Sequence, residues 1–172
     1  LGGGAGGSVL IITGTFKGYG DILANGGNGG VQYGSADNEG GAGAGGRVSI
    51  HYRKNEFTGI YDVSGGTSYF ERDVENQFEN GKFYWPNGGG SPGSLYTEEK
   101  IKDDEKGRTT LTFENEGKIS DYASFLSNPS ELNTTLTGFF LSGNASVSLH
   151  PENISYGATS ALDVSEFKAP HG

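Results

Sequence analysis

The stretch Gly6-Gly7-Ser8-Val9-Leu10-Ile11-Ile12 returns further along the chain as Gly45-Gly46-Arg47-Val48-Ser49-Ile50-His51. Each copy continues to a Phe-x-Gly and then a Gly-Gly, from Phe16 to Gly27 and from Phe57 to Gly66. The offset is 39 residues at both ends (46 − 7 and 65 − 26), with a two-residue slip between them because 57 − 16 is 41. A period of about 20 to 50 residues is typical of stacked repeat architectures. The repeat therefore predicts a scaffold.

Glycine accounts for 32 of the 172 residues. A collagen-like helix needs glycine at every third position, and the run Val9-Leu10-Ile11-Ile12 breaks that spacing. Disorder needs few β-branched and aromatic residues, whereas this chain has nine Tyr and ten Phe. The composition therefore favours an all-β protein in which short strands are joined by glycine-rich turns, because glycine adopts tight corners without steric strain.

Runs of β-branched and aromatic residues between glycines predict the strands. In one of them, Val48, Ile50 and Tyr52 share one face and the intervening polar residues share the other. The predicted strands are Ser8–Thr13, Gly20–Ala24, Arg47–Arg53, Gly59–Val63, Ser94–Glu98, Thr109–Glu114, Thr135–Leu141, Ala145–Leu149 and Ala161–Val164.

Two insertions interrupt this pattern, at 27–46 and 67–93. In the second, Phe70, Val74 and Phe78 follow each other at i, i+4 and i+8, which predicts a short helix with one apolar face. Phe83-Tyr84-Trp85-Pro86 is expected to pack the insertion onto the body, with a stacking platform for a sugar or another subunit as the alternative. The mixed charges of 98–106 predict a solvated turn.

The repeated motif, together with Gly90-Ser91-Pro92-Gly93-Ser94-Leu95-Tyr96 before a Thr-Leu-x-Phe strand, resembles the glycine-rich β-helix repeats of very large extracellular and cell-surface proteins. The resemblance covers about residues 1–117. It implies a right-handed parallel β-helix, a role in surface or matrix architecture, and no catalytic motif. The predicted fold is thus a solenoid with loop insertions, glycine-rich over 1–117 and continuing as glycosylated rungs over 118–172.

The formal charge is −9, which argues against a nucleic-acid partner because phosphate binding needs clustered Lys and Arg. No apolar run reaches the roughly 18 residues of a membrane span. The start at Leu1, without a signal-like segment, suggests a mature or excised piece. Three N-x-S/T sequons, at Asn133, Asn144 and Asn153, predict N-linked glycans and hence an extracellular or cell-surface location.

Two short glycine motifs match known ligand-binding or catalytic patterns, but a structural role explains each of them better. Gly2, Gly4, Gly7 and Gly41, Gly43, Gly46 each spell G-x-G-x-x-G, but strands follow them where a dinucleotide site needs a helix. The G-x-S-x-G of residues 89–93 has Pro92 after its serine and a strand beyond, which favours a turn over a nucleophile elbow.

Zinc is not expected, because the histidines His51, His150 and His171 are scattered and cysteine is absent. His51 is expected on the outer face of its strand. No cofactor is expected, and the one alternative is calcium bound through Asp37, Asn38 and Glu39 or through Asp103, Asp104 and Glu105, since hard cations favour clustered oxygens. A solvated loop is the simpler explanation of each cluster.

Asp21 and Asp62 each follow a Phe-x-Gly and could stack as the carboxylate pair of a sugar-cleaving enzyme. A solvated ladder is the preferred interpretation, and nothing in the sequence assembles a Ser–His–Asp triad. We therefore expect no enzyme, but a structural module of an extracellular glycoprotein that builds a surface coat, appendage or fibril, by self-association or within a longer chain. The alternatives are a carbohydrate-active β-helix enzyme and a carbohydrate-binding adhesion module.

Overall fold

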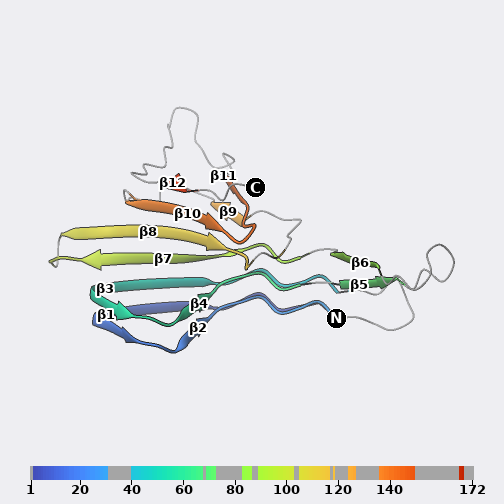
Figure 1. Ribbon diagram of the computed structural model, residues 1–172, viewed down its shortest axis with the longest axis horizontal. Helices are drawn as coiled ribbons and strands as arrows, with labels where there is room; N and C mark the ends of the chain where they lie inside the picture. The colour runs from blue at the N-terminus through green and yellow to red at the C-terminus, as the bar shows by residue number, and fades with distance from the viewer. Residues whose placement is uncertain are drawn as a thin grey trace.

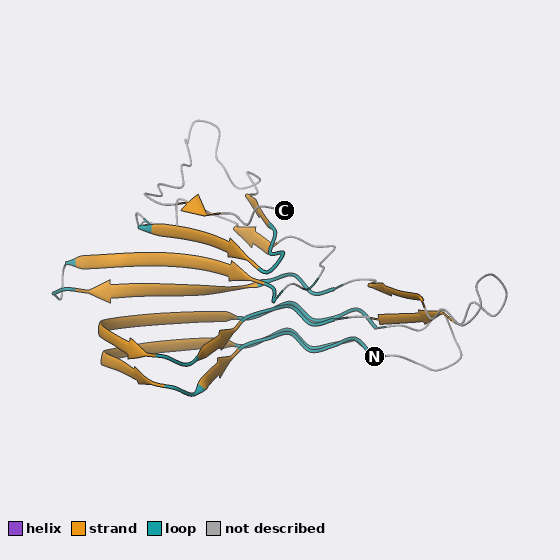
Figure 2. Ribbon diagram, in the orientation of Figure 1, coloured by secondary structure: helices purple, strands orange, loops and turns teal. Residues whose placement is uncertain are grey.

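The computed structural model describes residues 2–30, 40–67, 69–72, 83–86, 89–102, 105–116, 118, 124–126, 136–149 and 167–168. These residues form strands and loops and contain no helix (Figures 1 and 2). The strands are β1 (Ser8–Gly18), β2 (Asp21–Leu23), β3 (Arg47–Phe57), β4 (Ile60–Asp62), β5 (Tyr69–Arg72), β6 (Phe83–Pro86), β7 (Gly93–Lys100), β8 (Lys106–Glu114), β9 (Ser124–Leu126), β10 (Gly138–Ser142), β11 (Val147–Leu149) and β12 (Phe167–Lys168). A six-stranded sheet has the order β1-β3-β7-β8-β10-β12, and three smaller sheets pair β2 with β4, β5 with β6 and β9 with β11.

The strand predictions are confirmed with shifted ends, except for Ala161–Val164, which lies outside the described residues. The predicted inward face of β3 is also correct, because Val48 and Ile50 are buried at 1% and 0% exposure. The register departs from the sequence alignment in one respect. Ser8 pairs with Arg47 and Leu23 with Asp62, so the offset stays at 39 (47 − 8 and 62 − 23) and the two-residue slip is absent from the strands.

The prediction of a right-handed parallel β-helix is wrong. β1, β3 and β7 run parallel, but β8 pairs antiparallel with β7, so the main sheet is mixed. The cause lies in the charged run expected to be a simple turn. Ile101 N donates to Glu105 O (3.0 Å) between the two strands, and β8 pairs antiparallel beside β7 in the same sheet. No solenoid is evident in the described residues.

The predicted helix in the second insertion is wrong at Phe70, which lies on β5. β5 pairs antiparallel with β6, and Phe70 is the register partner of Trp85. Val74 and Phe78 lie outside the described residues. Two strands with aromatic residues in both favour an antiparallel ribbon, in which paired backbones satisfy their own hydrogen bonds.

Two hydrophobic cores lie on opposite faces of the six-stranded sheet. The first gathers Phe16, Ala24, Val48, Ile50 and Val63, between the main sheet and the β2–β4 pair. The second gathers Leu111, Phe113, Leu136 and Phe139, with Val147 of β11 packed against it. Val48 is the register partner of Leu95 on β7, and Leu95 is that of Thr112 on β8, so these three residues share one face. The buried residues of β8, however, are Leu111 and Phe113. Since successive side chains alternate between faces, the buried face changes between β7 and β8.

Beyond the strands, five glycine-rich segments form a bundle of extended chains (teal in Figure 2): residues 2–7, 24–30, 40–46, 63–67 and 89–93. Hydrogen bonds between them recur at every third residue. Gly3 N and Gly6 N donate to the carbonyls of residues 41 and 44, while Gly26 N and Gly29 N donate to those of residues 64 and 67. A three-residue period is that of the polyproline II helix, rather than the two-residue period of a strand. We call this assembly the glycine bundle.

The segment 40–46 lies at the centre of the glycine bundle. It bonds to all four others, through the donors Gly3, Gly66, Gly43 and Gly45. Contact is so close that a Cβ added to Gly43 would lie 2.0 Å from the carbonyl oxygen of Gly4. A Cβ added to Gly90 would in turn lie 1.8 Å from the carbonyl oxygen of Gly43. Glycine is required here by backbone-to-backbone packing, and not by the corners that the sequence suggested.

Candidate functional site

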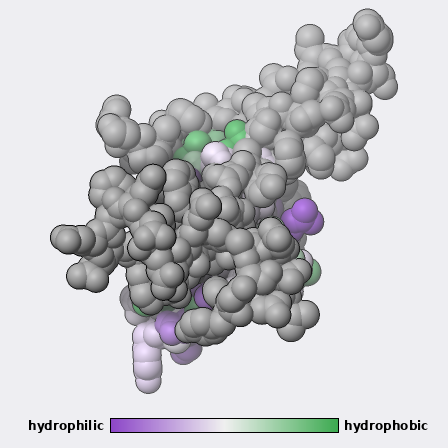
Figure 3. All heavy atoms as spheres, turned by 90° about the vertical axis from the view of Figure 1, so that its right-hand side faces the viewer, coloured by the Kyte–Doolittle hydropathy of each residue, from purple (hydrophilic) through white to green (hydrophobic). Residues whose placement is uncertain are grey.

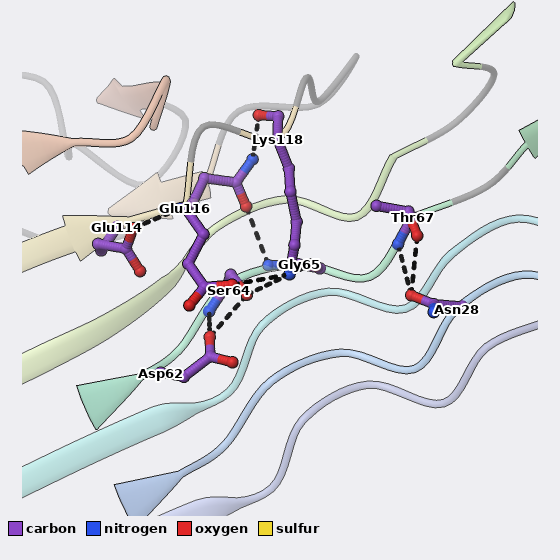
Figure 4. Close-up of polar contacts among 9 residues, drawn as sticks. Asn28, Asp62, Ser64, Gly65, Thr67, Glu114, Glu116 and Lys118 are labelled. Carbon is purple, nitrogen blue, oxygen red and sulfur yellow. Dashed lines mark hydrogen bonds and ion pairs between the residues drawn. The ribbon is translucent and has the colours of Figure 1, made fainter. Parts of the chain in front are cut away.

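A buried polar network lies where β4 enters the glycine bundle (Figure 4). Asp62 Oδ1 accepts from Ser64 N (2.9 Å) and Ser64 Oγ (2.6 Å). Ser64 is completely buried and Asp62 nearly so. Alternation along the end of β4 turns residues 62 and 64 to the same side, and the Asp side chain satisfies the backbone two residues on, as in an Asx turn.

The segment after β8 completes this network. Asn115, also completely buried, accepts from Gly65 N through Oδ1 (2.9 Å) and donates through Nδ2 to Lys118 O (2.8 Å). Lys118 Nζ donates to Ser64 Oγ (2.7 Å) and to Gly65 O (3.2 Å). A turn at Glu116, whose φ is 49°, returns the lysine toward the bundle. Residues 50 or more positions apart in the chain are thus tied together.

Glu114 borders the network with one carboxylate oxygen unsatisfied. Its Oε1 accepts from Glu116 N, but Oε2 is buried and has no hydrogen-bond partner. Burial is the main cause that raises the pKa of Glu114 above its usual value, with smaller contributions from the negative charges of Glu116 and Asp62. The hydrogen bond from Glu116 N and the charge of Lys118 act in the opposite direction.

The chemistry available to this network is limited by access. Lys118, Ser64 and Asp62 follow each other as donor, shared hydroxyl and acceptor, an order that could activate a serine. However, the Ser64 side chain has no exposed surface and its hydroxyl already contacts both neighbours. No substrate can reach it in this conformation. The network therefore acts structurally, as a satisfied polar core that joins the glycine bundle to the second half of the chain.

A second polar cluster lies on the other face, across β3 and β7. Ser49 Oγ lies 3.1 Å from His51 Nε2, and His51 Nδ1 lies 3.5 Å from Glu98 Oε2. Tyr96 donates its hydroxyl proton to the same Glu98 oxygen (2.8 Å), and Lys100 Nζ lies 4.0 Å from the other one. His51 is thus on the outward face, as predicted, but it is partnered and only partly exposed. Alternation along β3 predicts that Ser49 and His51 share a face, but no spacing in the chain predicts Glu98 beside them.

The order Ser49–His51–Glu98 is that of a hydrolytic triad, with each histidine nitrogen on the appropriate side. Two features weaken the likeness. The His51–Glu98 distance is longer than a good hydrogen bond. Ser49 also sits mid-strand on β3, which is flanked by β1 and β7. The backbone N–H groups around Ser49 therefore serve the two ladders, and none is directed at the sheet face as an oxyanion hole requires.

The residues proposed from sequence are scattered. Asp21 pairs with Ile60 and Asp62 with Leu23, and Asp21 is exposed whereas Asp62 is buried against Ser64, so the two do not form a catalytic pair. Asn144 lies in an exposed turn between β10 and β11 with φ of 61°, a position open to a glycan. The residues that lie outside the described parts are Asn133, Asn153, His150, His171, Asp37, Asn38, Glu39, Asp103 and Asp104.

The glycine motifs have structural roles. Gly43 and Gly46 of the second G-x-G-x-x-G lie in the centre of the glycine bundle, with N–H groups donating to the carbonyls of Gly27 and Ala24. Ser91 of the G-x-S-x-G lies in an extended segment of the bundle, where its carbonyl accepts from Gly45 N (2.9 Å), so the predicted turn is wrong. Glu105 of the second acidic cluster pairs with Lys102. Within the described ranges no group of three acidic or histidine side chains could hold a metal.

One open depression of about 400 Å³ adjoins the His51 cluster, lined among others by Ile12, His51, Arg53 and Lys100. Seen from the end that carries the β5–β6 pair, the described surface shows small hydrophobic and hydrophilic spots side by side (Figure 3). The described chain has no helix of the length and apolarity that a membrane crossing needs. Comparisons with protein-family models, with curated proteins and with solved structures gave no match.

Proposed function

We propose that this chain is a structural module of an extracellular glycoprotein, contributing to a surface coat, appendage or fibril. The observation that carries the proposal is the glycine bundle. Its five segments are held by backbone-to-backbone hydrogen bonds, and at positions such as Gly43 and Gly90 the contacts leave no room for a Cβ. Such an arrangement uses these residues to build a framework of backbone contacts. It leaves few side chains for chemistry in that part of the molecule.

One of the two polar clusters fits this role. The Ser64 network is closed to substrates and joins distant parts of the chain. The extracellular part of the proposal is supported by Asn144, whose sequon begins at an exposed residue in a turn. A net charge of −9 favours solubility, which an extracellular protein needs.

Glycan analysis of the protein purified from its own source tests this proposal. We expect the intact mass to fall on glycosidase treatment, and a peptide containing Asn144 to carry part of the difference. Antibody against the folded chain should label intact cells without permeabilisation. Unmodified Asn133, Asn144 and Asn153 together with labelling only inside cells would overturn the extracellular assignment.

A hydrolase is the second candidate, favoured by one observation, the order Ser49–His51–Glu98 with a depression beside it. An ester would be its simplest substrate, with Ser49 as nucleophile and His51 as base. The absence of backbone donors at the sheet face places this candidate behind the structural one.

A further inference from the structure

The outer edge of β1 is an unpaired sheet edge 11 residues long. β1 ends the six-stranded sheet, and among the described residues no strand pairs with its outer side. Arg47 N donates to Gly7 O (3.0 Å), so the odd-numbered residues from 7 to 13 direct their backbone groups toward β3. The alternation along a parallel ladder then turns the N–H and C=O groups of Ser8, Leu10 and Ile12 outward.

Over Ser8–Thr13 this edge lacks the charged side chains and prolines that usually protect a free strand. Natural edges are guarded by charged side chains, proline or bulges. Between Ser8 and Phe16 the strand has no charged residue and no proline. Leu10 and Ile12, whose backbone groups face outward, are instead large apolar residues, with side chains 66% and 72% exposed. An edge of this kind is a template for another strand.

The charge distribution indicates that the other strand belongs to a second copy. The chain carries 21 acidic residues, yet none precedes Asp21. The one charged residue of β1 is Lys17, so two copies that pair through Ser8–Phe16 bring no like charges together across the ladder. The glycines at 4 and 7 also leave the edge unshielded, since a Cβ on either would meet nothing within 4 Å.

We propose that two copies of this chain associate through their β1 edges, antiparallel and related by a two-fold axis. A register centred on Ile11 places Leu10 of one copy opposite Ile12 of the other, twice. Outward-facing backbone groups are thereby paired, and the four exposed apolar side chains meet in two cross-strand pairs. Each such pair contributes about 0.2–1 kcal/mol. The inference stands independently of glycosylation and cellular location.

Sedimentation velocity across a concentration series tests the association. We expect a monomer–dimer equilibrium, and a dissociation constant raised at least about tenfold by Leu10→Lys with Ile12→Lys. Ile101→Lys, at a similarly exposed apolar residue in the β7–β8 connection, is the matched control and should associate as the parent does. The milder pair Leu10→Thr with Ile12→Thr keeps the strand if the lysines prevent folding. A parent that stays monomeric, or a dimer indifferent to these changes, would overturn the proposal.

Disulfide trapping tests the register, because the natural chain has no cysteine. Directly paired residues of an antiparallel ladder lie about 5.5 Å apart at Cα, within disulfide range. A mixture of Leu10→Cys and Ile12→Cys should therefore cross-link under mild oxidation faster than either variant alone. Equal rates would contradict the two-fold register, and assemblies that grow without limit would contradict a closed dimer.

Discussion

Leu95 and Tyr96 are neighbours on strand β7, yet they pack into different hydrophobic cores. Leu95 contacts the first core with Val48 and Ile50, and Tyr96 contacts the second with Leu111 and Phe113. β7 is therefore the strand at which the buried face of the sheet changes. The strand is partly buried on both faces, and it joins a parallel half of the sheet to an antiparallel hairpin.

Because the cores are separate, a cavity in one should act mainly on its own half. Leu136 has no exposed surface and lies in the second core. We expect Leu136→Ala to destabilise the protein by about 2–5 kcal/mol. Amide hydrogen exchange should show the larger loss of protection in β8 and β10, and a smaller one in β1 and β3. Equal losses in all four strands would mean that the sheet opens only as one unit.

Lys118 is expected to stabilise the interior through its hydrogen bonds. Lys118→Met keeps the aliphatic stem but leaves Ser64 Oγ and Gly65 O without their ammonium donor. Loss of a donor to buried acceptors costs about 1–3 kcal/mol. Urea denaturation should show this loss, while Lys102→Met, at an exposed ion pair, should change stability by less than about 0.5 kcal/mol. Similar values for both variants would show that the network contributes nothing specific.

Glu114 should make stability depend on pH. Its folded pKa lies above the usual 4.5 chiefly because the carboxyl is buried, so the folded state holds a proton more tightly than the unfolded state. The ionised carboxylate therefore destabilises the fold above the folded pKa, and this penalty is relieved as pH falls through it. Glu114→Gln should stabilise the protein at pH 7, and its advantage should shrink toward pH 4. An advantage that stays constant over this range would contradict the account.

Ser49 decides between the two candidate functions. The structural assignment predicts that the purified protein hydrolyses p-nitrophenyl acetate no faster than the Ser49→Ala variant does. His51 alone can act as a weak base, so a His51→Gln variant separates general imidazole reactivity from a triad. A burst of product that depends on both residues would instead establish the hydrolase.

The extent to which the sequence determines this structure differs between its halves. The Gly-Gly-x-Val-x-Ile repeat correctly predicts β1, β3 and their offset, because backbone stacking and apolar alternation are both visible as spacing. The hairpin of β7 and β8 was missed because its mixed charges resemble any solvated turn, and only tertiary pairing sets the chain direction. The 47-residue offset between β3 and β7 (94 − 47) is likewise hidden by the insertion at 67–93.

The two polar clusters could be predicted only in part. Alternation places Ser49 and His51 on one face of β3, but their meeting with Glu98 depends on that hidden offset. Asn115 and Lys118 give no local signal of contact with residues 64 and 65, since nothing in their spacing relates to the repeat. Buried polar contacts across 50 residues are a product of the fold, and not of a local pattern.

The glycine bundle is the framework on which the structural assignment depends, and one pair of substitutions tests it most directly. Gly41 and Gly43 lie two residues apart in the central segment, but only a Cβ on Gly43 would strike a carbonyl, whereas one on Gly41 would meet nothing within 4 Å. Denaturant unfolding should show Gly43→Ala less stable by at least about 2 kcal/mol, or unable to fold. Gly41→Ala should match the parent within about 1 kcal/mol. Equal stabilities of the two variants would contradict the bundle.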